Sequence, residues 1–123
     1  MNSAVLVGLR VLVVEDEMLV SLLIEDILGD QQCVIVGPCD QIKPALEAAR
    51  TEVIDLAILD VNIAGSKVYP VAEVLAARNV PFLLLSGYGG SAVPSNHPDW
   101  RVCSKPFRSE ELVGMLIEQV QSG

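Results

Sequence analysis

The chain has 123 residues, and its 16 acidic against 8 basic side chains give it a net charge of −8. This length suits one domain with a sizeable core, so we expect residues 1–123 to form a single domain. The acidic balance disfavours nucleic acid and anionic membranes as partners. No apolar run is long enough to cross a bilayer, and the N-terminus lacks the features of a signal peptide, so a cytoplasmic protein is expected.

Five short apolar runs, separated by amphipathic segments, predict the strands of a parallel sheet. They are nearly continuous in Val, Leu and Ile, as is usual for strands that helices cover on both faces. In chain order they are "RVLVVE" (10–15), "CVIVG" (33–37), "DLAILD" (55–60), "PFLLLS" (81–86) and "WRVCS" (100–104). Their alternation with helices indicates a doubly wound α/β fold with right-handed crossovers, although periodicity does not fix the strand order.

The segments between these runs predict the helices. Residues 17–29 carry apolar side chains at helical spacing with Gly29 at the end, and Asp40 is placed to cap a helix over 41–50. Further helices are expected over 68–79 and from about Ser109 onward. Residues 87–99 hold three Gly, two Pro and three Ser or Asn, so the fourth helix is expected to be short or distorted.

Four of the five predicted strands lead into a residue that can do chemistry. Glu15 and Asp16 follow the first strand, Asp60 ends the third, Ser86 ends the fourth and Lys105 follows the fifth. Because the carboxyl ends of parallel strands share one edge of a sheet, we expect these side chains to meet along one rim. Each alone has an ordinary explanation as a helix cap, a turn residue or a solvated charge. Their convergence on one edge favours a functional site.

The carboxylates of this rim predict a divalent cation, since Glu15, Asp16 and Asp60 would otherwise repel one another. Oxygen ligands with room for water suit Mg²⁺, and the backbone carbonyl of Asn62 could join them. With Lys105 on the other side, a tetrahedral dianion would meet a metal ion, an ammonium and a hydroxyl, which are the groups that phosphoryl transfer needs. The nucleophile would then be a carboxylate, and the product an acyl phosphate.

The motifs "VLVVEDE", "LAILDVN", "LLLSG" and "KPF", in this order over the whole chain, resemble the receiver domain of two-component response regulators. The resemblance implies a (βα)5 sandwich, a five-stranded parallel sheet with strand order 2-1-3-4-5. It implies that Asp60 accepts a phosphoryl group from a histidine kinase or a histidine phosphotransfer protein. Ser86 would contact the phosphoryl oxygens and report phosphorylation, and Lys105 would pair with the phosphate.

The same resemblance implies a magnesium site and a mode of signalling. Asp16 and Asp60 would bind Mg²⁺ through their carboxylates, Glu15 through water, and Asn62 through its carbonyl. The protein would be a phosphoacceptor with slow self-dephosphorylation rather than a turnover enzyme. No output domain follows Gly123, so the leading interpretation is a stand-alone receiver that signals through a partner protein or shuttles phosphoryl groups between proteins. A receiver cut from a longer chain is the alternative.

The chain departs from the family pattern at its aromatic switch. The aromatic residue that usually stands three positions before the lysine is Val102 here. "VPFLLLSGYGG" is similar to the P-F-x-F-A-T-G-Y pattern of the FAT GUY subgroup of receivers, in which the fourth helix tends to be short or mobile. Tyr88 of this stretch is therefore a candidate for part of the switch role, and simple packing over the site is the alternative.

Three other classes of protein fit the sequence less well than a phosphoacceptor receiver. An aspartyl-nucleophile phosphohydrolase usually has a second acid two residues after the nucleophile, where this chain has Asn62, which cannot donate a proton at neutral pH. A degenerate receiver that only binds partners is disfavoured by the complete set of rim residues. A flavodoxin-like cofactor binder is disfavoured because no phosphate-cradling loop follows the first strand.

Overall fold

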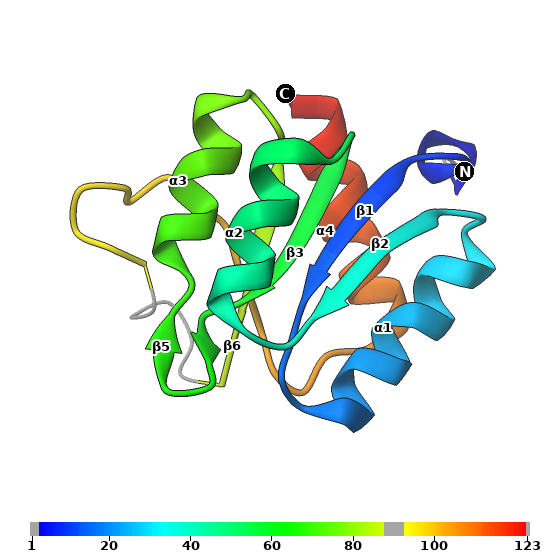
Figure 1. The fold of residues 1–123 in the computed structure, drawn as a ribbon. Helices are drawn as coiled ribbons and strands as arrows, with labels where there is room; N and C mark the ends of the chain where they lie inside the picture. Colours follow the sequence, from blue (N-terminus) through cyan, green and yellow to red (C-terminus); the bar gives the residue numbers. More distant parts are fainter. Residues whose placement is uncertain (1–2, 88–92, 123) are drawn as a thin grey trace.

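A five-stranded parallel sheet forms the centre of the protein, as the computed structural model of residues 3–87 and 93–122 shows (Figure 1). The strands lie in the order β2-β1-β3-β6-β7, and every neighbouring pair is parallel. This arrangement confirms the predicted order 2-1-3-4-5. The strands are β1 (Arg10–Val14), β2 (Val34–Cys39), β3 (Leu56–Asp60), β6 (Phe82–Ser86) and β7 (Val102–Ser104).

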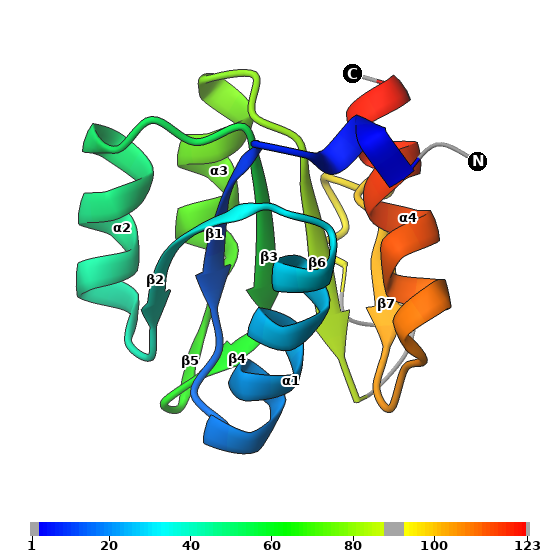
Figure 2. The same cartoon turned by 90° about the vertical axis from the view of Figure 1, so that its right-hand side faces the viewer.

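Helices cover both faces of the sheet. Helices α2 and α3 lie on one face, and α1 and α4 lie on the other (Figures 1 and 2). A short 3-10 helix, η1, precedes the first strand. The bounds of these elements are η1 (Ser3–Leu6), α1 (Met18–Asp30), α2 (Ile42–Thr51), α3 (Tyr69–Ala77) and α4 (Ser109–Ser122). Among the described residues, no helix is long and apolar enough to cross a membrane.

The apolar strands divide the core into two halves. Leu12 and Val14 of β1 pack with α2 and α3, whereas Val11 and Val13 pack with α1 and α4. This division follows from the strand geometry, since successive side chains point to opposite faces. All five residues of β3 and all five of β6 are buried. Burial on both faces explains why the sequence shows continuous apolar runs instead of an alternating pattern.

The structure corrects two predicted helix boundaries. Helix α2 follows Gln41, whose side chain makes no capping hydrogen bond, so the prediction of Asp40 as the cap was wrong. Helix α1 continues through Gly29 to Asp30, and the chain turns at Gln32 with a φ of 61°. A non-glycine residue, Gln32, thus takes the left-handed conformation that commonly follows a helix end. Residues 87 and 93–99 form no helix, and residues 88–92 of the predicted fourth helix lie outside the described residues.

A two-stranded antiparallel hairpin follows β3 and was not predicted. It consists of β4 (Asn62–Ile63) and β5 (Ser66–Lys67), in which Asn62 pairs with Lys67 and Ile63 with Ser66. The two connecting residues have positive φ values, 49° at Ala64 and 84° at Gly65. Two-residue hairpin loops favour this conformation because its twist matches that of the strands. The hairpin lies at the carboxyl edge of the main sheet (Figure 2).

Candidate functional site at the carboxyl edge of the sheet

Three carboxylates meet at the carboxyl edge, as the strand ends predicted. Glu15, Asp16 and Asp60 each offer an oxygen that lies within 4.8 Å of the other two. Glu15 and Asp16 follow β1, and Asp60 is the last residue of the neighbouring strand β3. The backbone holds Glu15 in place, because its N–H donates a 2.9 Å hydrogen bond to the carbonyl of Cys39 at the end of β2. Glu15 and Asp60 are buried and Asp16 is exposed, so the cluster opens to solvent on one side.

Lys105 supplies the cation of this edge. Its Nζ lies 2.9 Å from Asp60 Oδ2, 2.9 Å from Glu17 Oε1 and 3.1 Å from Glu15 Oε1. The position of Lys105 is fixed through the backbone, since its N–H donates a 2.9 Å hydrogen bond to the carbonyl of Ser86 at the end of β6. One ammonium is therefore shared by three carboxylates, two from the β1–α1 loop and one from the end of β3.

The pKa values of the cluster reflect burial and this sharing. Desolvation raises the pKa of Glu15 to about 7, and the hydrogen bond and charge of Asp60 add to it, while the Glu17 amide and Lys105 act in the opposite direction. For Lys105, burial alone would lower the pKa. The hydrogen bonds from Lys105 to Glu17 and Asp60, with the charges of Asp60 and Glu15, outweigh burial and raise that pKa above its usual value. At neutral pH Glu15 is therefore close to its pKa, and Lys105 stays charged.

Glu15 Oε1 is a buried oxygen of the cluster that lies near a cation but accepts no hydrogen bond. Lys105 Nζ donates a 3.4 Å hydrogen bond to Glu15 Oε2, whereas Oε1, 3.1 Å from the same Nζ, has no hydrogen-bond partner among the described residues. A buried oxygen without a partner is costly unless a proton or a cation satisfies it. Three oxygens with one solvent-exposed side match the ligands that Mg²⁺ prefers, because this ion usually keeps several waters. The acidic cluster therefore fits a Mg²⁺ site.

The β4–β5 hairpin is attached directly to this cluster. Asp16 Oδ2 accepts a 2.9 Å hydrogen bond from the N–H of Ala64 in the hairpin turn. Asn62 N–H donates to Asp60 Oδ1 at 3.3 Å, and the Asn62 side-chain oxygen accepts a 2.8 Å hydrogen bond from Lys67. The position of Asn62 beside Asp60 agrees with the predicted rim. The hydrogen bond from Lys67 to the Asn62 side chain was not predicted.

The remaining predicted residues are placed as follows. Ser86 ends β6 and is 1% exposed, and its neighbour in β7 is Ser104. Val102, at the usual position of the aromatic switch, is half-buried in β7. Tyr88 lies outside the described residues, so its role stays a prediction.

Sequence reasoning missed Glu17 as a member of this site. Glu17 ends the motif "VLVVEDE", but its contact with Lys105 joins positions 88 residues apart in the sequence. Only the strand order brings the β1–α1 loop close to the residues that follow β7. The sequence does contain a hint of this role, because "EDE" has three consecutive acids. Interaction with the N-terminus of one helix does not by itself account for three acids.

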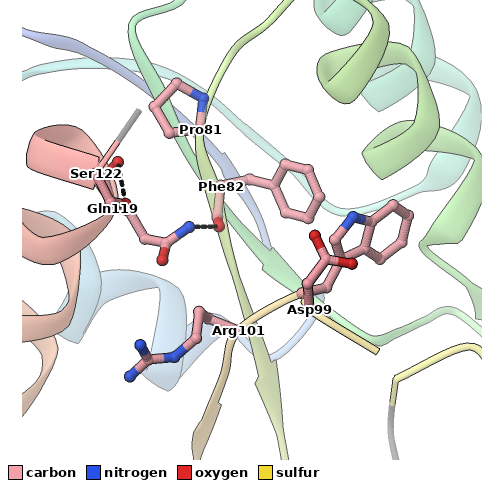
Figure 3. Close-up of a pocket in the computed structure, with 7 residues that line it drawn as sticks. Pro81, Phe82, Asp99, Arg101, Gln119 and Ser122 are labelled. Atoms are coloured by element: carbon pink, nitrogen blue, oxygen red, sulfur yellow. Dashed lines mark hydrogen bonds between the residues drawn. The ribbon is translucent and has the colours of Figure 1, made fainter. Parts of the chain in front are cut away.

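A hollow of about 340 Å³ lies at the end of the sheet opposite the acidic cluster (Figure 3). It opens where β6 and β7 begin, beside the last turns of α4, and Gln119 there donates a 2.8 Å hydrogen bond to the carbonyl of Phe82. Its lining contains one acid, Asp99, and one base, Arg101, whose guanidinium is paired with Glu118 at 3.2 Å. It holds no cluster of charged groups comparable to the carboxyl edge, which is therefore the candidate site.

Comparison with known proteins identifies relatives of this fold. The family model described as "Response regulator receiver domain" matches residues 11–117. A solution structure of SdrG from Sphingomonas melonis Fr1 is 36% identical, with a TM-score of 0.81, and the alignment covers 93% of this chain and 97% of that one. The BeF3-activated conformation of SdrG, attributed to Pseudomonas melonis Fr1, is also 36% identical, with a TM-score of 0.76 and coverage of 98% and 99%.

A more distant structure shares the fold. The receiver domain of the sensor histidine kinase PA1611 from Pseudomonas aeruginosa PAO1 is 21% identical, with a TM-score of 0.79, and the alignment covers 93% of this chain and 98% of that one. In that structure a magnesium ion is coordinated in the active-site cleft. A search of curated protein sequences found no match.

Proposed function

This chain belongs to the response regulator receiver domain family, and from that premise we propose that Asp60 is the residue that accepts the phosphoryl group. A receiver is a phosphoacceptor signalling module rather than a turnover enzyme, and residues 1–123 as a whole would form this module. The observation that carries the proposal is the placement of Asp60 between a metal-binding cluster and an ammonium. Asp60 shares the cluster with Glu15 and Asp16, and its Oδ2 lies 2.9 Å from Lys105 Nζ.

The proposed reaction moves a phosphoryl group from a phosphohistidine to Asp60. A carboxylate oxygen of Asp60 attacks the phosphorus, the phosphorus–nitrogen bond breaks with its electron pair going to the imidazole, and an aspartyl phosphate forms. Lys105 balances negative charge on the transferring group, and the hydroxyl of Ser86 donates to a phosphoryl oxygen. Asp16, Asp60 and the Asn62 carbonyl, with Glu15 acting through water, would hold a Mg²⁺ ion, which would supply positive charge for the phosphoryl oxygens.

Asn62 supports storage of the phosphoryl group over its turnover. A phosphohydrolase needs an acid near the nucleophile to protonate the leaving group, and an amide cannot do this at neutral pH. The Asn62 side-chain oxygen is engaged by Lys67 and its N–H by Asp60. This position therefore stabilises the phosphoacceptor without offering a proton.

The surface beside the site supports a protein as the phosphodonor, either a histidine kinase or a histidine phosphotransfer protein. Met18, Leu19 and Leu22 at the start of α1 are 75%, 81% and 54% exposed. A hollow of about 280 Å³ joins Met18 and Leu22 to Glu15 and Asp16 of the acidic cluster. Exposed apolar side chains next to a reactive centre suit a protein donor, whose docking would bury them and deliver a phosphohistidine to Asp60.

The similarity of residues 80–90 to the FAT GUY pattern supports placing the chain in that subgroup, with Tyr88 as a switch residue. Pro81 precedes β6 and Phe82 begins it, both in the positions of this pattern, and Gly87 follows Ser86. The substitution of Leu-Leu-Ser for Phe-Ala-Thr leaves the hydroxyl in place while removing one aromatic ring.

The phosphoacceptor proposal is tested by incubating the protein with acetyl phosphate and Mg²⁺ and measuring the intact mass. Wild type should gain about 80 Da, the mass of one phosphoryl group, only when Mg²⁺ is present. The Asp60→Asn variant should gain nothing under the same conditions. An equal adduct in Asp60→Asn, or no adduct in wild type, would contradict the assignment, and sustained phosphate release would favour the hydrolase.

The protein-donor proposal needs a separate test. Leu19→Glu, at the most exposed of these apolar positions, should slow labelling by any histidine kinase of a panel that phosphorylates wild type. Labelling by acetyl phosphate should be unchanged, since the small donor does not require the α1 surface. Equal kinase labelling of both proteins would show that α1 is not the docking surface.

A further inference from the structure

Lys105 is held by a carboxylate outside the proposed metal cluster, that of Glu17. Its Nζ lies 2.9 Å from Glu17 Oε1, the same distance as from Asp60 Oδ2. We propose that Glu17 is a positioning residue that competes with the phosphoryl group of Asp60 for the Lys105 ammonium and so limits phosphorylation. This inference rests on the proposed role of Asp60.

The backbone of Glu17 directs its carboxylate to Lys105 and not to the helix. Glu17 is the N-cap of α1, and its side chain makes no capping hydrogen bond. Its N–H donates to Glu15 Oε2 at 3.1 Å, and its carbonyl accepts from Ser21 at 2.9 Å. Both hydrogen bonds fix the residue next to the cluster. A helix N-terminus alone does not explain a carboxylate that is turned to a lysine from another element.

Binding of a cation would neutralise some of the carboxylates around Lys105 and not others. A cation in the acidic cluster would neutralise Glu15 and Asp60, which are two of the three anions that Lys105 contacts. Glu17 is not in that cluster and keeps its charge. After phosphoryl transfer, Lys105 is therefore shared between Glu17 and the phosphoryl oxygens, and Glu17 is the anion that opposes their contact with the ammonium.

The exposure of Glu17 makes this competition adjustable. Its side chain is 63% exposed, whereas the side chain of Lys105 is 17% exposed. Solvent-exposed ion pairs are weak and are screened by salt. Glu17 can therefore release Lys105, and its effect on phosphorylation should be a few-fold change that disappears when salt screens the pair.

The competition is measured by binding of beryllofluoride, a phosphoryl mimic, at saturating Mg²⁺. Fluorine NMR during a titration with beryllium in excess fluoride gives the apparent affinity. Glu17→Gln should bind beryllofluoride about threefold more tightly than wild type at low salt, as expected for loss of one exposed ion pair. The initial rate of labelling by acetyl phosphate should rise by a similar factor. Both ratios of variant to wild type should approach one at about 1 M salt.

Two further variants separate the contact from a general loss of charge. Asp26→Asn removes a carboxylate from the exposed surface of the same helix and should leave the affinity unchanged. Glu17→Asp keeps the charge on a shorter side chain, so its affinity for beryllofluoride should lie between those of wild type and Glu17→Gln. Equal or weaker beryllofluoride binding by Glu17→Gln, or a gain that persists at high salt, overturns the role of Glu17. Failure of wild type itself to bind beryllofluoride would instead contradict Asp60 as the phosphoacceptor.

Discussion

Replacing Lys105 with Met should destabilise the metal-free protein, and the loss should grow with pH. Lys105 is the ammonium shared by Glu15, Glu17 and Asp60, and the side chain of Glu15 is completely buried. Desolvation already raises the pKa of Glu15 to about 7 with Lys105 present. Without the ammonium, ionisation of Glu15 becomes harder still, so Glu15 should stay protonated in the folded variant through the neutral range.

The size of the pH-dependent loss follows from proton linkage. A buried acid whose pKa is raised on folding stabilises the protein at low pH, and that contribution is lost as the pH rises through the folded pKa. Between about pH 6 and about pH 8, folded wild type releases the Glu15 proton, while the folded variant retains it. Integrated over this range, the difference makes the variant lose about 1.4 kcal/mol more, relative to wild type, at the higher pH.

Urea denaturation in the presence of a metal chelator, followed by the fluorescence of Trp100, measures this difference. The control is Lys67→Met, which removes one positive charge from an exposed lysine that is hydrogen-bonded to Asn62. Mg²⁺ should recover most of the loss at the higher pH, because the ion replaces the missing cation. If the loss were equal at both pH values, or larger at the lower one, Lys105 would not be stabilising the ionised form of Glu15.

Three further predictions concern metal binding, the core and the switch. Mg²⁺ affinity, measured by calorimetry, should rise at least about tenfold from about pH 5.5 to about pH 8, since the ion displaces the proton of Glu15, whose pKa is about 7; a flat profile would contradict that role. Leu59→Ala, which truncates a fully buried side chain between the sheet and α2–α3, should lower the free energy of unfolding by about 2–5 kcal/mol in urea titrations. Tyr88→Ala should reduce the beryllofluoride-induced change in the backbone NMR signals of residues 86–99; an intact change would rule out Tyr88 as a switch.

The parts of the fold that were predictable from sequence are those with a strong local pattern. The run "LAILD" is buried at every position of β3, so its continuous apolar character identified both the strand and its place inside the sheet. Because parallel strands end at one edge, the sequence pattern predicts that Asp60 shares a rim with Glu15 and Asp16. Their close approach also depends on the strand order, in which β3 lies next to β1.

The hairpin after β3 was not predictable because its turn lacks the usual residues. A two-residue loop with positive φ at both positions normally contains Asn-Gly or Asp-Gly. Here Ala64 takes a φ of 49°, which costs energy for a residue with a Cβ. The hydrogen bond from Ala64 N–H to Asp16 Oδ2, at 2.9 Å, helps to hold this conformation. The turn therefore depends on a carboxylate from the β1–α1 loop, 48 residues away in sequence.

The charges of the site couple the stability of the fold to the binding of a cation. The site holds four acids, Glu15, Asp16, Glu17 and Asp60, and all but Asp16 contact the ammonium of Lys105. This excess of negative charge disfavours the metal-free fold, and the same excess provides the attraction for a divalent cation. An acid in place of Asn62 would add a fifth negative charge and a proton donor next to Asp60. The amide avoids both, so position 62 offers no proton to a phosphoryl group on Asp60.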